Sequence, residues 1–105
     1  MSTVYVVQEN PKVDIVSANK FGELKALADK REQVHLMPES IINNLKRQLK
    51  YFNDEDYLLL LGDPALIGAA MTVASNYNNG NVKVLKWDRM EKMYYPVKLN
   101  FNQRL

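Results

Sequence analysis

The longest apolar run of the chain lies at residues 57–61, which read Tyr-Leu-Leu-Leu-Leu. Apolar residues at successive positions, rather than alternate ones, are typical of a strand that is covered on both faces. A Gly-Asp-Pro turn follows, in which Asp63 predicts a helix N-cap and Pro64 fits the first helical position. Apolar residues continue at helical spacing to about residue 76, and a β-rich run follows Gly80. The pattern predicts a central βαβ unit with two parallel strands.

The N-terminal part of the chain has two short β-rich stretches. Residues 4–8 and 13–16 flank residues 9–12, which have turn chemistry. Pairing the two stretches across that turn sets Val6 opposite Ile15, so that apolar residues meet. The pattern predicts an N-terminal β-hairpin.

Two more helices are predicted before the apolar run. Asn19 is placed to cap a short helix over residues 20–28, which carry apolar residues on one side and charged residues on the other. Residues 33–37 are a short strand candidate, and Pro38 then opens a longer helix that reaches about residue 52. The apolar stripe of this longer helix consists of Ile41, Ile42, Leu45, Leu49 and Phe52.

A second hairpin is predicted at the C-terminal end. Residues 93–101 alternate between apolar and polar side chains, which is the pattern of a strand with one covered face. A turn centred on residues 89 and 90 sets Val84 opposite Tyr95. Pro96 has no N–H to donate to a ladder, so the last strand is predicted to be an edge strand or to turn that position to solvent.

These elements predict that residues 1–105 form a single α/β domain. We expect a mixed sheet of about five to six strands and about three helices, with a central βαβ unit and a hairpin at each end. A domain of 105 residues has room for one compact site but not for separate cofactor and substrate domains.

The chain offers few groups for catalysis. Cysteine is absent, which excludes disulfides, thiolate zinc sites and cysteine nucleophiles, and His35 is the single histidine. Three carboxylates, Asp14, Asp63 and Asp88, have a spacing that matches no metal-binding signature. We therefore predict no cofactor and no metal, and we favour a protein that is not an enzyme.

Hydropathy and charge bear on where the protein works. The apolar run is too short to span a bilayer, and the first residues lead directly into a β-rich stretch with no basic region or cleavage site, so we expect a cytoplasmic protein with no membrane partner. The formal net charge of +2 is too small to indicate nucleic-acid binding by itself.

Gly62 and Asp63 are the best ligand-pocket candidate by position. They follow a central strand and precede a helix, which is where open α/β sheets bind ligands. Asp63 adds negative charge and Pro64 removes an N–H, so the chemistry disfavours a phosphate. We favour helix capping as the role of Asp63.

Two basic surfaces are candidates for binding. Lys46, Arg47 and Lys50 share one side of the longer helix, with no aromatic side chain among them to stack on bases. The C-terminal hairpin interleaves basic and aromatic residues, of the kinds that anchor protein interfaces. Its candidate binding residues are Trp87, Arg89, Lys92 and Tyr94.

Three stretches carry a family resemblance: VYVVQE at residues 4–9, DYLLLLGDPALIGAA at residues 56–70 and VLKWDRMEKMYYPV at residues 84–97. The chain resembles a family of small proteins encoded by tailed bacteriophages of aquatic bacteria. The resemblance implies a phage origin and work in the cytoplasm of an infected bacterial cell. It brings no activity, cofactor or site residue with it.

Our leading hypothesis is a non-enzymatic accessory protein that binds a host or phage protein through the C-terminal hairpin. The alternative is a nucleic-acid-binding accessory protein that uses the basic hairpin and helix face, and a small metal-dependent hydrolase or nuclease ranks third. The sequence leaves open whether the chain also forms homo-oligomers.

Overall fold

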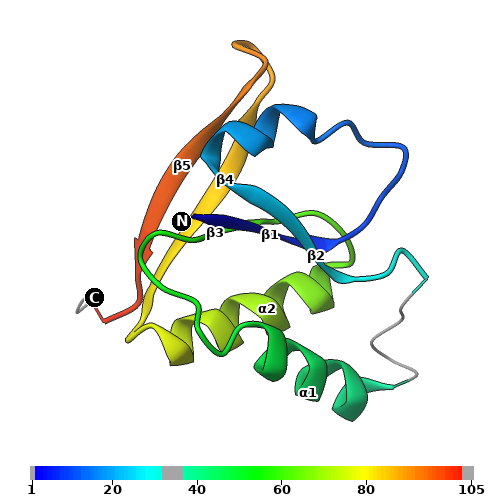
Figure 1. The fold of residues 1–105 in the computed structure, drawn as a ribbon, viewed down its shortest axis with the longest axis vertical. Coiled ribbons are helices and arrows are strands. Elements are labelled where there is room, and N and C mark those ends of the chain that lie inside the picture. Colours follow the sequence, from blue (N-terminus) through cyan, green and yellow to red (C-terminus); the bar gives the residue numbers. More distant parts are fainter. Residues whose placement is uncertain (1, 32–36, 103–105) are drawn as a thin grey trace.

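Five strands form one mixed sheet in the order β2-β1-β3-β4-β5 (Figure 1). The computed structural model describes residues 2–31 and 37–102. Neighbouring strands pair in parallel among β2, β1, β3 and β4, and β5 is antiparallel to β4. The strands are β1 (Thr3–Gln8), β2 (Glu23–Ala28), β3 (Tyr57–Leu59), β4 (Asn81–Asp88) and β5 (Met93–Asn100).

Helices cover both faces of the sheet. Helices α1 (Pro38–Gln48) and α2 (Pro64–Tyr77) lie side by side on one face, and the 3₁₀ helix η1 (Val16–Phe21) lies on the other (Figure 1). Within the described residues no helix has the length and apolar character needed to cross a membrane. The predicted single-domain α/β fold is confirmed.

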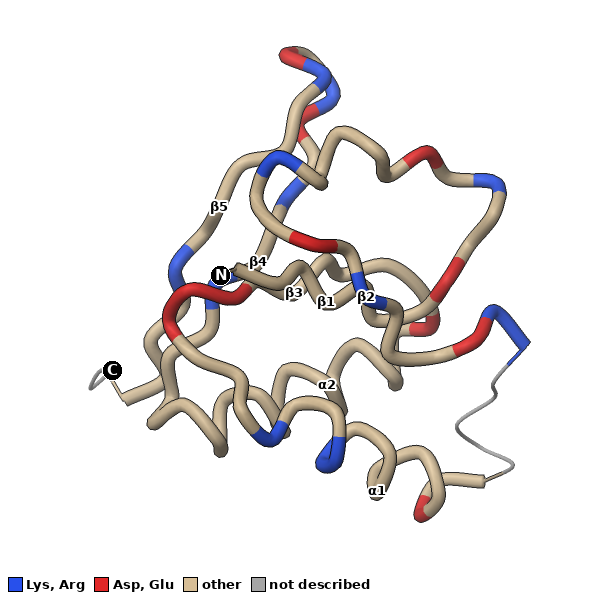
Figure 2. The backbone as a smooth tube through the Cα atoms, in the orientation of Figure 1, with Lys and Arg blue, Asp and Glu red and all other residues tan. Residues whose placement is uncertain are grey.

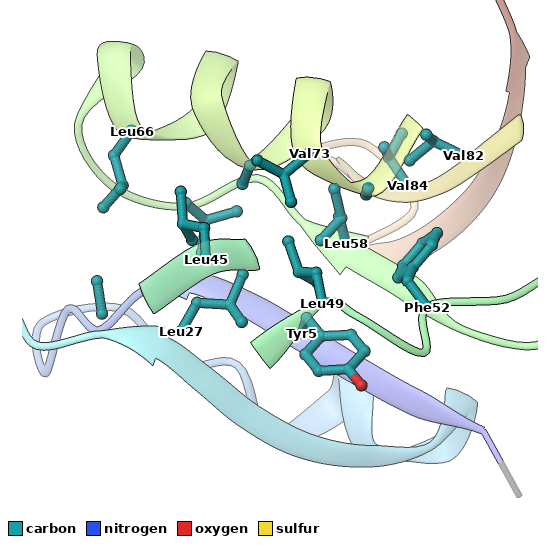
Figure 3. Close-up of a cluster of buried hydrophobic side chains, with 14 of the residues drawn as sticks. Tyr5, Leu27, Leu45, Leu49, Phe52, Leu58, Leu66, Val73, Val82 and Val84 are labelled. Atoms are coloured by element: carbon teal, nitrogen blue, oxygen red, sulfur yellow. The ribbon is translucent and has the colours of Figure 1, made fainter. Parts of the chain in front are cut away.

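The central βαβ unit is confirmed as β3, α2 and β4, with β3 and β4 parallel. Leu58 is fully buried on the helix side of the sheet, where it lies among side chains that include Phe52 and Val73 (Figure 3). Leu59 is buried on the opposite face, together with Val4 and Val6. The core strand is therefore covered on both faces, as its unbroken apolar run predicts.

The apolar run is longer than the strand that it forms. Leu60 is 37% exposed and Leu61 is half-buried, so the prediction that full burial extends from Leu58 through Leu61 is wrong for these two residues. The Leu61 N–H donates to the Leu59 carbonyl at 2.9 Å, which bends the chain out of the ladder directly after β3. The Leu61 carbonyl then accepts the Gln8 N–H at 2.9 Å, which ties the segment after β3 to the last residue of β1.

The predicted N-terminal hairpin is wrong. Strand β1 pairs in parallel with β2 and β3, and residues 13–16 form no strand. The Asp14 carboxylate accepts the Val16 N–H at 3.0 Å, a local hydrogen bond that competes with strand pairing. The predicted helix over residues 20–28 is also wrong, since η1 ends at Phe21 and β2 follows after Gly22.

Helix α1 begins at Pro38 as predicted and ends at Gln48, four residues before the expected end. The stripe of the predicted helix is confirmed as a core element, with Ile41, Leu45, Leu49 and Phe52 buried and Ile42 packed against them. The strand predicted at residues 33–37 and the only histidine, at position 35, involve residues outside the described ranges.

The C-terminal hairpin is confirmed, with a longer turn than expected. Val84 lies opposite Val97 rather than opposite Tyr95, a shift of two residues that keeps every side chain on its predicted face. Asp88 explains the shift, because its carboxylate accepts the N–H groups of Met90 and Glu91 at 2.8 and 3.0 Å and so closes a wider turn.

Strand β5 is an edge of the sheet, as Pro96 predicts. The Phe101 N–H donates to the Gly80 carbonyl at 2.8 Å, so Gly80 and Phe101 form a hydrogen-bonded pair. Hydrogen-bonded and non-bonded pairs alternate along an antiparallel ladder. The pair of Leu85 and Pro96 is therefore a non-bonded pair. The nitrogen of Pro96 faces the outer edge, where it interrupts the row of donors that another strand would use.

Candidate binding cleft beside the C-terminal hairpin

The hairpin of β4 and β5 extends past the rest of the sheet. Strand β3 pairs with β4 only at Leu58 opposite Val84 and Leu59 opposite Leu85, whereas β4 continues to Asp88. The part of the hairpin beyond Leu85 is a two-stranded arm whose tip projects from the body (Figure 1). The arm carries both positive and negative charges at its tip (Figure 2).

Trp87 and Tyr94 face each other across the arm. Their ring centroids are 4.9 Å apart and their planes are inclined at 64°, an edge-to-face contact that favours both rings. Tyr94 is buried beside Leu85, and Trp87 is 43% exposed. Burial raises the pKa of the Tyr94 phenol, and the negative charge of Asp14 raises it further. The prediction that these two rings share a face with Leu85 is confirmed.

A cleft of about 740 Å³ lies at the base of the arm. Strand β3 ends here beside the middle of β4, and the carboxyl ends of parallel strands are where open α/β sheets bind ligands. The lining of the cleft is mostly apolar, and the volume of the cleft falls in the range of ligand pockets. It consists of residues 12–15, residues 59–61, and Val84, Leu85, Lys86, Trp87, Tyr94 and Val97.

Three charged residues line the cleft: Lys12, Asp14 and Lys86. The Asp14 carboxylate is partly engaged, because it accepts the Val16 N–H at 3.0 Å. Two ammonium groups against one carboxylate give the lining a positive excess.

Arg89 and Lys92 lie in the turn at the tip of the arm, outside this cleft, and both are exposed. Lys92 adopts a positive φ of 51°, which completes the turn that Asp88 closes. Met90 between them is 93% exposed. The structure thus brings Trp87 and Tyr94 to the cleft and leaves the two cations at the tip free to contact another molecule.

Gly62 and Asp63 contact the start of α2 and the side chain of Gln8. The Asp63 carboxylate accepts the Leu66 N–H at 3.1 Å, which confirms the predicted cap of α2. The Asp63 N–H in turn donates to the side-chain oxygen of Gln8 at 2.8 Å. A Cβ on Gly62 would lie 2.4 Å from the Cβ of Gln8, and the φ of Gly62 is +119°, so glycine is required here.

Gln8 stands at the point where the chain order of the sheet reverses. Strand β1 connects outward to β2 over one face, and β3 connects outward to β4 over the other, so β1 and β3 flank a topological switch point. Gln8 ends β1 there, is 6% exposed, and also donates from its side-chain nitrogen to the Asp29 carbonyl at 3.2 Å. The protein's own side chain thus fills the space beside Gly62.

The basic side of α1 lies far from the arm, at the opposite end of the molecule (Figure 2). Lys46 and Arg47 are exposed, and an Arg47 guanidinium nitrogen donates to the Asn44 side-chain oxygen at 2.6 Å. The Lys50 ammonium lies 5.6 Å from the ring centroid of Tyr51, which is 79% exposed. Our expectation that no aromatic ring lies among these cations is wrong, because Tyr51 follows Lys50 directly in the chain.

The three carboxylates considered as metal ligands are each used locally. Asp14, Asp63 and Asp88 all accept hydrogen bonds from backbone N–H groups within three residues. Across residues 2–31 and 37–102, no three histidine or carboxylate side chains gather as a metal site would require.

Sequence reasoning missed the part of the cleft that comes from residues 12–15. The predicted hairpin places Lys12 in its turn and residues 13–16 in its second strand, which hides the role of Lys12 and Val13 as cleft-lining residues. A usable signal was present in Asn10 and Asp14, because both accept a backbone N–H two residues ahead, as turn residues do.

Comparison with known proteins identifies a family. The family model described as "Phage Pam3 gp32-like protein" matches residues 2–101. No curated protein and no solved structure matches the chain.

Proposed function

The chain belongs to the Phage Pam3 gp32-like protein family, and from that premise we propose that it binds a host or phage protein during infection of a bacterium. The proposed surface is the C-terminal arm, with Trp87, Arg89, Lys92 and Tyr94. The proposed place of action is the cytoplasm of the infected cell.

The observation that carries this proposal is the exposure of large side chains on a projecting arm. Trp87 is 43% exposed and Met90 is 93% exposed, although both types bury readily. Tryptophan and arginine are enriched among the residues that dominate binding energy at protein interfaces. Tyr94 is buried and contacts the Trp87 ring from the neighbouring strand, so its role in this surface is to hold the tryptophan ring in place.

Capture of partners from a lysate of infected bacteria, followed by affinity measurement with the purified partner, tests the proposal. We expect the double variant Trp87→Ala/Arg89→Ala to bind at least about tenfold more weakly, a loss of about 1.4 kcal/mol. Lys46→Ala/Arg47→Ala is the matched control on α1 and retains full affinity. Recovery of the same partners at the same affinity by both double variants would place the interface elsewhere.

Trp87 contacts Tyr94, so its removal also affects the arm itself. Arg89→Ala alone changes an exposed turn residue and provides a variant whose fold is not at issue. Its thermal unfolding curve is expected to match that of the wild type, with a reduced affinity for the partner.

A second candidate is nucleic-acid binding through α1. Its specific support is the exposed ring of Tyr51 beside Lys50, with Lys46 and Arg47 nearby, since an exposed ring and adjacent cations together suit a base and its phosphates. This candidate predicts an affinity for single-stranded DNA or RNA that falls steeply with salt, through counterion release. A mobility-shift assay at low salt that shows no complex removes it.

A further inference from the structure

We infer that the cleft at the base of the arm receives an apolar side chain from a segment of the partner protein, and that acidic residues flank that side chain. This inference rests on the proposed function and specifies the chemistry of the partner.

Exposed apolar side chains gather at the cleft. Val13 is 39% exposed, Leu60 is 37% exposed and Trp87 is 43% exposed, and all three line it. Single exposed apolar residues are common on protein surfaces, but a group of them around one concave site marks a place where another apolar group binds. Burial of these side chains by a partner contributes favourable free energy in proportion to the apolar area removed from water.

Local hydrogen bonds hold the segment of the cleft that follows β1. The Asn10 side chain accepts the Lys12 N–H at 3.0 Å, and the Asn10 carbonyl accepts the Val13 N–H at 3.0 Å. The Ala18 N–H donates to the Ile15 carbonyl at 2.9 Å, where η1 begins. The lining is therefore shaped in the free protein, which reduces the entropy cost of binding.

Charge at the rim selects the partner. Lys12 and Lys86 are exposed, and Asp14 is the one acidic residue among the cleft-lining residues described. The positive excess favours acidic residues next to the bound apolar side chain, and it disfavours basic ones.

The form of the cleft favours a protein segment over a small molecule. A small-molecule pocket encloses most of its ligand, whereas this cleft is open to solvent and has the exposed Trp87 of the arm in its lining. A chain segment can place one side chain in the cleft and continue along the arm toward Arg89.

Trp87 is the only tryptophan of the chain and lines the cleft, so its fluorescence reports occupancy. The probe is a short capped peptide without tryptophan or tyrosine that has a central leucine between aspartates. Two matched peptides replace the leucine by alanine or the aspartates by lysines. We expect saturable binding of the first peptide with a Kd below about 1 mM, and at least about tenfold weaker binding of both others.

Variants locate the binding. Leu60→Asp and Lys86→Glu are expected to weaken the first peptide at least about tenfold, whereas the charge-matched control Lys46→Glu leaves it unchanged. No saturation by the peptide up to about 1 mM, or equal binding to wild type and Lys86→Glu, overturns the inference. Saturable binding of anilinonaphthalene sulfonate without any peptide binding also overturns it, because the cleft is then a site for a small amphipathic anion.

The full partner separates this inference from the proposed function. Leu60→Asp changes the cleft and keeps the tip, and Arg89→Ala changes the tip and keeps the cleft. Loss of the partner with Arg89→Ala but not with Leu60→Asp retains the proposed function and refutes the cleft as its site. Loss with both supports the inference.

Discussion

The side-chain oxygen of Gln8 accepts the backbone N–H of Asp63 at 2.8 Å, which joins the last residue of β1 to the N-cap of α2 across 55 positions of the chain. The side-chain nitrogen of Gln8 donates at the same time to the Asp29 carbonyl, just after β2. One buried amide thus ties together three segments at the switch point of the sheet.

Replacement of Gln8, which is 6% exposed, by alanine removes the acceptor of the Asp63 N–H and the donor to the Asp29 carbonyl. We expect a loss of about 1–3 kcal/mol in the free energy of unfolding, measured by urea denaturation. Gln48→Ala is a matched control, because the Leu27 carbonyl that accepts from Gln48 also accepts from Asn44. An equal loss of stability in both variants would show that the Gln8 hydrogen bonds at the switch point contribute no more than those of an ordinary side-chain amide.

Truncation of Leu58 removes a fully buried side chain from the centre of the core (Figure 3). We expect Leu58→Ala to lower the free energy of unfolding by about 2–5 kcal/mol through lost transfer energy and a cavity. Leu60→Ala, at a position 37% exposed, is the control and is expected to cost less than about 1 kcal/mol. Similar midpoints of chemical unfolding for the two variants would contradict the assignment of Leu58 to the core.

The cap of α2 predicts a graded response at Asp63. Asp63→Ala loses the acceptor for the Leu66 N–H and is expected to cost about 0.5–2 kcal/mol, whereas serine and asparagine keep an acceptor and are mild. Thermal unfolding of the three variants checks the order. If Asp63→Asn keeps the wild-type melting temperature and still abolishes partner binding, Asp63 has a role in binding as well as in capping.

Two tyrosines predict how stability depends on alkaline pH. Burial raises the pKa of Tyr5 and of Tyr94, with Asp56 and Asp14 as the respective second causes. Below the unfolded-state pKa of about 10 both states are protonated, and above it the unfolded state loses its proton first. The stability contribution is therefore present below about pH 10 and is lost as the pH rises through the folded-state pKa.

Melting curves on both sides of that pH measure the effect. Tyr94→Phe and Tyr5→Phe are each expected to reduce the alkaline loss of stability. If stability still falls with rising alkaline pH after both buried tyrosines are replaced, other groups cause the loss.

The βαβ unit, α1 and the C-terminal hairpin were predictable because local signals and the apolar pattern agree there. Asp63 and Pro64 mark the start of α2, and Gly80, with a positive φ of 81°, follows shortly after its end at Tyr77. The apolar run before them is unbroken, which is typical of a strand covered on both faces.

The N-terminal half was predicted less well, since long-range pairing decides it. Strand β2 reads Glu-Leu-Lys-Ala-Leu-Ala, a set of good helix formers, yet it lies in the sheet because β1 has an open edge beside it. A sequence pattern shows that residues 3–8 are a strand and does not name the strand beside it. The cleft escaped prediction for the same reason, because its lining depends on where residues 12–15 go.

Strand β1, which precedes the other four strands in the sequence, occupies an interior place in the finished sheet. Strand β1 can pair early with β2, but its helix-side residues Tyr5 and Val7 belong to a core that also needs α1, β3 and α2. The nascent chain therefore carries an uncovered apolar sheet face until α2 has been synthesised, and contacts of such long sequence separation form slowly. This face of the sheet is covered only after α2 has been synthesised, and a chain stopped before α2 presents it to the chaperones and proteases of the cell.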